Sequence, residues 1–160
     1  MRRSENGFSL IELLVVVAII LIIAAIAVPN YLRARIAANQ ASAVESCRAI
    51  NEANITYISD YGQGFAATLL NLEPPSAGGQ ATYSASGIID SVLASGHKSG
   101  YTLSYSAVSP DANGYYQAYT LNASPSQVGI TGNSYYYSDQ TFIIRTDLTQ
   151  TATATDPPLQ

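Results

Sequence analysis

The residues of this chain that could support specific chemistry lie close to its N-terminus, where a short polar segment meets a long apolar one. The polar segment, MRRSENG, ends at Gly7, directly before Phe8. A glycine leaves extended backbone without a side chain, which a peptidase could bind. Glu12 is the fifth residue of the apolar run. A charged side chain inside a bilayer costs about 2.5–3.5 kcal/mol, so such residues usually mark function and have a partner. These positions indicate a site that a peptidase could bind and a carboxylate that should have a partner.

The apolar run extends from Phe8 to Val28 and reads FSLIELLVVVAIILIIAAIAV. About 21 residues at ~1.5 Å per residue would span ~30 Å, the thickness of the hydrocarbon core of a bilayer. The apolar core of a secretory signal peptide is shorter, about 7–15 residues, and here the helical pattern continues past Pro29. We therefore expect a transmembrane helix that is retained in the mature protein.

The run GFSLIELLVV, residues 7–16, resembles the prepilin cleavage and methylation motif of type IV pilins. The resemblance covers roughly the first 30 residues, including Pro29 at the position where pilins often bend. It implies that a prepilin peptidase/methyltransferase cuts between Gly7 and Phe8 and methylates the new amine of Phe8. It also implies that Glu12 pairs with the Phe8 amine of a neighbouring subunit during assembly. The alternative is a lone Glu12 that stays neutral in the membrane.

The charges around the apolar run do not orient it in a membrane. Arg2 and Arg3 precede the run, but Arg33, Arg35 and Arg48 follow it, so the positive-inside rule gives no clear answer. The resemblance implies that the leader, residues 1–7, lies in the cytoplasm. It further implies a precursor held as a single-pass protein of the inner membrane, and a mature subunit in an extracellular surface filament.

Beyond the apolar run we expect a kink or a short melted stretch at Pro29, because proline removes a backbone donor and clashes with the preceding turn. An amphipathic helix over residues 29–61 should follow and end near Gly62. On a helical wheel its apolar face contains Ile36, Val44, Cys47, Ile55 and Ile58, flanked by Ala43, Ile50 and Tyr61, with Arg35, Glu45, Ser46 and Glu52 elsewhere. Cys47 is therefore expected to be a buried structural thiol.

The remainder, residues 62–160, is predicted to form a globular β-rich head. Breakers make residues 73–87 a loop, and residues 88–95 could form a short helix. Aromatic and alternating patterns predict strands at residues 101–107 and 115–122, and a further hairpin of residues 134–138 and 141–145. Residues 149–160 form a polar tail or an edge segment. The order predicts an α+β protein, with a long helix packed on a small antiparallel sheet, as in the type IV pilin fold.

Composition narrows the possible functions. The chain is 48% hydrophobic and only 11% charged, against about 25% charged in soluble domains. Lys and Arg number 7 and Asp and Glu 11, so the chain lacks the positive charge that nucleic acid binding needs. His97, the single histidine, has no evident catalytic partner, and the sequence contains no Walker-type, CxxC or HExxH motif. We expect no enzymatic activity, no cofactor and no metal site.

Twelve tyrosines are unusual for a chain of this length. Strand propensity and amphipathic packing explain them most simply. The sharper alternative is an adhesive or inter-subunit surface formed by Tyr115, Tyr116, Tyr135, Tyr136 and Tyr137.

The resemblance implies a structural subunit of a type IV pilus-like filament that serves adhesion, motility or surface attachment. Its partners would be copies of itself, the prepilin peptidase/methyltransferase, the assembly platform in the inner membrane, and the membrane before assembly. Alternatives are a pseudopilin of a type II secretion system, a minor pilin with a tip-adhesin or DNA-uptake role, and a plain anchored domain. The absence of tryptophan, and the distance in sequence between Asp147 and Asp156, disfavour a pseudopilin with its calcium ligands.

Overall fold

The computed structural model describes residues 8–159, and the chain divides into two compact units. We call residues 1–35 the N-terminal unit and residues 36–160 the C-terminal unit. Helix α1, Leu10–Tyr61, begins in the first unit and ends in the second. The helix runs through Pro29 without a melted stretch, and a kink at that residue stays a prediction. As predicted, α1 ends directly before Gly62, whose positive φ of 63° terminates the helix.

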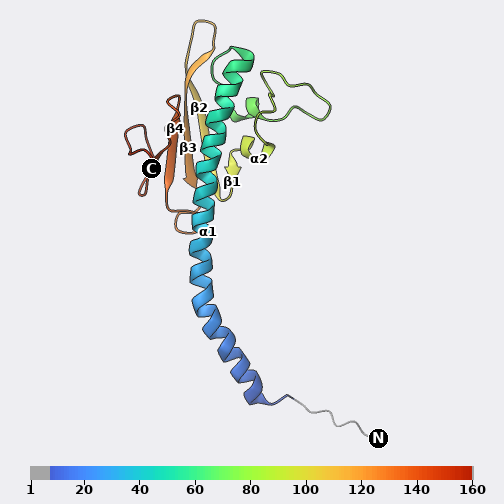
Figure 1. The fold of residues 1–160 in the computed structure, drawn as a ribbon, viewed down its shortest axis with the longest axis vertical. Coiled ribbons are helices and arrows are strands. Elements are labelled where there is room, and N and C mark those ends of the chain that lie inside the picture. The colour runs from blue at the N-terminus through green and yellow to red at the C-terminus, as the bar shows by residue number, and fades with distance from the viewer. Residues whose placement is uncertain (1–7, 160) are drawn as a thin grey trace. The chain divides into compact units, whose positions relative to one another are not determined.

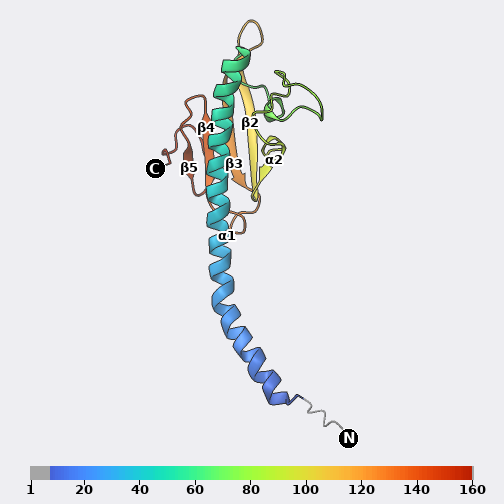
Figure 2. The same cartoon turned by 45° about the vertical axis from the view of Figure 1, so that its right-hand side comes forward.

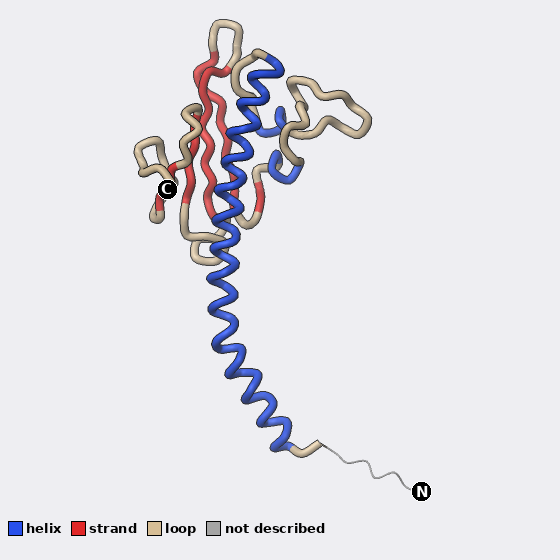
Figure 3. Tube along the Cα trace, viewed as in Figure 1, coloured by secondary structure: helices blue, strands red, loops and turns tan. Residues whose placement is uncertain are grey.

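The described part of the C-terminal unit contains a five-stranded antiparallel sheet in the order β1-β2-β3-β4-β5 (Figures 1 and 3). Neighbouring strands in the sheet are also neighbours along the chain, so the sheet is a simple meander. The strands are β1 (His97–Lys98), β2 (Tyr101–Pro110), β3 (Tyr116–Pro125), β4 (Tyr135–Asp139) and β5 (Arg145–Asp147). This arrangement confirms the predicted α+β fold.

The sheet turns one face toward the part of α1 that belongs to the C-terminal unit (Figures 1 and 2). Side chains alternate between the two faces of a strand. Accordingly Tyr101 and Leu103 of β2, and Tyr119, Leu121 and Ala123 of β3, are buried while the residues between them are more exposed. These residues form one core with the apolar side chains of α1.

The buried face of α1 differs in part from the predicted one. Val44 and Cys47 are buried as expected, with Ala43 and Ile50 beside them. Ile55, however, is 50% exposed. The predicted position of Ser46 was also wrong, because this residue is buried and its hydroxyl donates to the backbone carbonyl of Ser42. The centre of the buried face follows residues 43, 47, 50, 54 and 57 instead.

The observed buried face of α1 is rotated about the helix axis relative to the predicted one, and two asparagines explain why. Both lie in the core and form hydrogen bonds with distant segments. The hydroxyl of Tyr119 donates to Asn51 Oδ1 at 2.8 Å. The hydroxyl of Tyr105 and the backbone N–H of Ala66 lie 3.0 Å and 3.3 Å from Asn54 Oδ1. A helical wheel that considers only apolar residues does not predict that these amide side chains lie in the core. Once their hydrogen bonds are formed, their burial is tolerated.

The shorter elements also depart from the predicted boundaries. Helix α2 covers only Ser91–Ala94, because the side chain of Asp90 accepts the backbone N–H of Leu93 and caps the helix there. A 3₁₀ helix, η1 (Leu69–Leu72), was not predicted. Strands β2 and β3 both continue three residues beyond their predicted ends, to Pro110 and Pro125.

The predicted hairpin near the C-terminus is displaced on its second side. Strand β5 starts at Arg145, not at Thr141. Asp139 accepts the backbone N–H of Thr141 at 2.9 Å, and Phe142 has a positive φ of 61°, so this stretch forms a turn. The C-terminal residues lie along the sheet edge, since Leu159 N–H donates to the carbonyl of Ile144 at 2.8 Å. This confirms the predicted edge segment.

Candidate processing and assembly site

The described part of the N-terminal site begins with Phe8, which is 85% exposed and precedes α1. The backbone N–H of Ser9 donates to Glu12 Oε2 at 3.0 Å. The carbonyl of Ser9 accepts the N–H of Leu13 at 3.3 Å, which is the first helical bond. Gly7 lies outside the described residues, so the predicted cleavage between Gly7 and Phe8, and the methylation of Phe8, stay predictions.

The contact between Ser9 and Glu12 gives the carboxylate a partner within its own chain. A glutamate at the third helical position that reaches back to the N-cap backbone N–H forms one half of a capping box. The carboxylate also lies at the positive end of the helix dipole. The pattern Ser-x-x-Glu at residues 9–12 is a local signal for this contact, which is distinct from the predicted partner on another subunit and from a lone, neutral Glu12. Any test of Glu12 must separate the two roles.

The apolar side chains on both sides of Glu12 form a continuous exposed surface. Leu10 is 81% exposed, and Ile22 and Ile26 are 64% and 66% exposed. By length and composition α1 contains a segment able to cross a membrane, and none of that segment is buried within the structure. A surface of this kind needs lipid or protein around it, because apolar side chains gain about 1.5–3 kcal/mol each when they leave water.

Two residues with reactive side chains lie far from the N-terminal site along the chain, in the C-terminal unit. Cys47 is fully buried, and this burial raises the pKa of its thiol to about 12, which confirms a structural role. His97 lies in strand β1 and not in a loop as expected, with an exposed side chain whose Nδ1 is 3.4 Å from Thr102 Oγ1.

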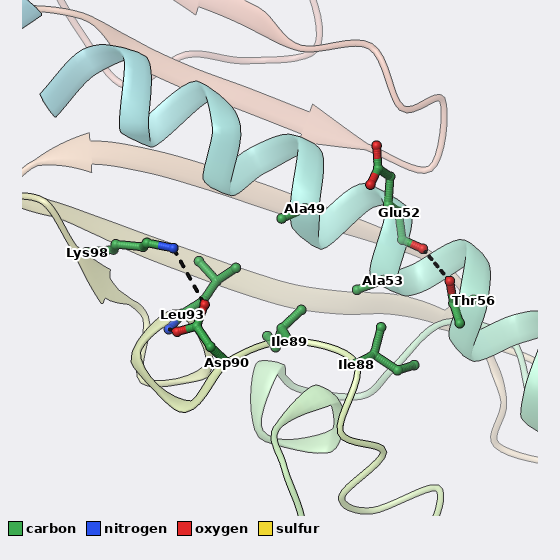
Figure 4. A pocket seen from close by; sticks show the side chains of 9 residues that line it. All are labelled: Ala49, Glu52, Ala53, Thr56, Ile88, Ile89, Asp90, Leu93 and Lys98. Carbon is green, nitrogen blue, oxygen red and sulfur yellow. Dashed lines mark hydrogen bonds and ion pairs between the residues drawn. The ribbon is translucent and has the colours of Figure 1, made fainter. Parts of the chain in front are cut away.

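A hollow of about 310 Å³ lies between α1 and the segment around α2 (Figure 4). Lys98 Nζ points at Asp90 and lies 3.5 Å from its Oδ2. The backbone N–H of Leu93, and secondarily Lys98, hold the pKa of Asp90 below its ordinary value. The helix cap and the ion pair therefore explain the presence of Asp90 and Lys98 at this hollow by their structural roles. Among residues 8–159 no three His, Cys, Asp or Glu side chains gather where they could hold a metal ion.

The five tyrosines considered as an adhesive surface do not lie together. Tyr136 and Tyr137 are buried in β4, so packing explains them. In the sheet Tyr136 is opposite Ala123, near the end of β3, whereas Tyr116 begins that strand. The predicted group is therefore divided between the two ends of the sheet.

Comparisons with known proteins agree with the N-terminal geometry. A family model described as the prokaryotic N-terminal methylation motif matches residues 2–28. The type IV major pilin protein PilA of Myxococcus xanthus is 43% identical over 56 residues, 35% of this chain and 26% of that protein. The type IV wide pilus major component PilA4 of Thermus thermophilus is 60% identical over 37 residues, 23% of this chain and 28% of that protein.

The chain therefore spans about a quarter of the length of the curated relatives it matches. No solved structure matches it significantly. The residues that the family model matches include the leader and the apolar segment that carries Glu12. Residues 2–28 therefore carry the prokaryotic N-terminal methylation motif, and the chain, with its long helix and antiparallel sheet, is similar to type IV pilins.

Proposed function

We propose that this chain is the precursor of a structural subunit of a type IV pilus-like filament. The observation that carries the proposal is the methylation motif placed at the start of an apolar helix with exposed side chains. In the precursor, lipid would cover this helix. In the filament, helices of neighbouring subunits would replace the lipid, so the apolar surface stays out of water in both states.

The proposed maturation follows from the same residues. A prepilin peptidase/methyltransferase cuts between Gly7 and Phe8 and methylates the Phe8 amine, and Glu12 then pairs with that amine on an adjacent subunit. The assembly platform of the inner membrane extracts the subunit from the membrane pool into an extracellular filament. The segments would act as leader (1–7), filament-core helix (8–28), amphipathic helix (29–61) and head (62–160).

The names of the relatives favour a major structural subunit over the alternatives. Both are described as major components of type IV pili, which supports neither a pseudopilin nor a minor pilin. A structural subunit contributes contacts and not catalysis, so we assign the chain no enzymatic role. Adhesion, motility and surface attachment are activities that such a filament would provide.

Intact-mass measurement of protein sheared from the cell surface tests this function. We expect the main species to start at Phe8 and to carry one added methyl group. The variant Gly7→Ala should be processed more completely than Gly7→Phe, because the peptidase site accepts little side chain. A surface species that retains residues 1–7, or a sheared fraction without this chain, would contradict the proposal.

A further inference from the structure

Three segments of the C-terminal unit meet around a hollow of about 220 Å³. They are the loop that follows α1, the turn at Tyr83 and the turn between β2 and β3, and Tyr57 of α1 and Asn71 of η1 complete the lining. The aromatic side chains of the lining are Tyr57, Phe65, Tyr83, Tyr115 and Tyr116. The hollow is therefore surrounded by rings from segments that are distant in sequence.

Apart from the tyrosines, the polar side chains of the lining are neutral amides. Gln63, Asn71 and Asn113 contribute them, and the lining contains no Lys, Arg, Asp or Glu. Within residues 8–159 the side chains of Gln63 and Asn113 make no hydrogen bond, so their donors and acceptors are available. Asn71 Nδ2 lies 3.4 Å from the carbonyl oxygen of Tyr83.

The position of Tyr83 is fixed by its backbone, which leaves its ring available. Thr82 and Ala85 form a two-residue turn with reciprocal backbone hydrogen bonds of 3.1 and 3.0 Å. The hydroxyl of Tyr57 donates to the Tyr83 carbonyl at 2.7 Å. The side chain of Tyr83 itself is 58% exposed. Replacing this side chain therefore leaves the contacts of the turn in place.

The wall formed by the turn between β2 and β3 is equally well held. Asp111 Oδ1 accepts the backbone N–H groups of Asn113 at 2.8 Å and Tyr115 at 2.9 Å, which shapes the turn between β2 and β3. The loop after α1 joins this wall through Gly64, whose φ is +74°. A side chain at Gly64 would collide with the carbonyl oxygen of Tyr116, so only glycine allows this close approach.

We infer that this hollow binds one unit of a neutral glycan. Sugar rings present an apolar C–H face and a rim of hydroxyl groups. Tyrosine rings match the face, and side-chain amides pair with hydroxyls as donor and acceptor at once. The lining offers no opposite charge to an anionic or a cationic ligand. A proline-rich peptide could also use aromatic rings, but proline has a backbone carbonyl and no N–H, so it would leave the side-chain oxygens of Gln63 and Asn113 without donors.

The size of the hollow limits the strength of binding. About 220 Å³ is below the ~300–1,000 Å³ of sites that enclose a whole small ligand, so a single site should bind weakly. All lining residues belong to the C-terminal unit, and the inference does not depend on polymerisation. Repetition of the site along a filament would raise the avidity.

The test uses the full chain in a zwitterionic detergent without a sugar headgroup, because maltoside detergents would compete for the site. Saturation-transfer NMR is recorded with a panel of neutral hexasaccharides of glucose, mannose, galactose and N-acetylglucosamine. We expect transfer to at least one member. Tyr83→Ala should weaken that binding about tenfold. Tyr31→Ala removes a tyrosine that is 65% exposed and lies outside the hollow, so it should have no effect.

Asn113→Ala provides a second variant in case Tyr83→Ala does not fold, as judged by circular dichroism. It removes an exposed amide whose backbone N–H keeps its bond to Asp111, and it should also weaken sugar binding. The inference is overturned if no member of the panel binds, or if the Tyr83 and Tyr31 variants bind equally. Preferential binding of a heparin hexasaccharide or of a proline-rich peptide would overturn it as well.

Discussion

The two roles of Glu12 can be separated by comparing Glu12→Gln with Glu12→Leu. In the single chain Glu12 Oε2 accepts the Ser9 N–H at 3.0 Å, and in the proposed filament the carboxylate also pairs with a Phe8 amine. Glutamine keeps an oxygen that can serve the capping box but removes the charge. Leucine removes both. A difference in filament yield between Glu12→Gln and Glu12→Leu therefore measures the role of the helix cap. A defect that both variants share measures the role of the charge.

The expected magnitudes are distinct. Loss of a helix cap costs about 0.5–2 kcal/mol. Helix α1 should stay folded despite this loss, because lipid or protein surrounds it. Removing one partner of a buried, hydrogen-bonded charge pair costs about 2–5 kcal/mol, equivalent to a factor of about 30–4,000 in the assembly equilibrium. Membrane insertion should be unchanged or improved, because a charged side chain no longer enters the bilayer. We therefore expect both variants to reach the membrane and neither to form normal amounts of filament.

The assay compares the amount of chain in the membrane fraction with the amount in sheared surface filaments. Ile11→Leu is the matched control, since it alters a neighbouring apolar side chain and leaves cap and charge intact. Cleavage should be normal in every variant because Gly7 and Phe8 are unchanged. Normal filament yield from Glu12→Gln, with a defect only in Glu12→Leu, would refute the pairing mechanism and assign Glu12 to the helix cap.

Three further predictions concern the C-terminal unit, and we expect residues 36–160 to fold alone as a soluble monomer in which all three can be measured. Asn54→Ala should destabilise this fragment by about 1–3 kcal/mol, because it leaves the buried N–H of Ala66 without its partner. In urea this is a midpoint shift of about 1–2 M, whereas the exposed control Thr56→Ala should change stability by less than about 0.5 kcal/mol; equal midpoints would argue against the buried amide as an anchor. Cys47 should resist iodoacetamide at pH 8 until the fragment is unfolded, and rapid labelling of the folded state would contradict its burial. Because burial raises the pKa of Cys47 from 9.0 to about 12, its stabilising contribution should be complete below pH 9 and decline as the pH rises toward 12. Burial also raises the pKa values of Tyr101, Tyr105 and Tyr119, so in urea titrations at pH 8 and 10.5 Cys47→Ala should lose less stability than the unchanged fragment, and an equal loss would contradict the contribution of Cys47.

Features that depend on short stretches of chain were predictable from the sequence. The apolar run, the end of α1 at Gly62, and the pairing of β2 with β3 each follow from neighbouring residues, through helix length, a glycine terminator and strand alternation. The contact between Ser9 and Glu12 is also local, because the Ser-x-x-Glu pattern that produces it lies within one helical turn.

The rotation of α1 on the sheet and the hollow beside Tyr83 were decided only by the tertiary structure. The hydroxyl groups that allow Asn51 and Asn54 to be buried come from Tyr119 and Tyr105, more than fifty residues away along the chain. A helical wheel weighs apolar side chains and cannot count hydrogen-bond partners that do not belong to the helix. For the same reason composition reveals twelve tyrosines but not which of them share a site. Spacing along a chain sets local geometry, whereas the burial of a polar group depends on which distant partner the fold brings to it.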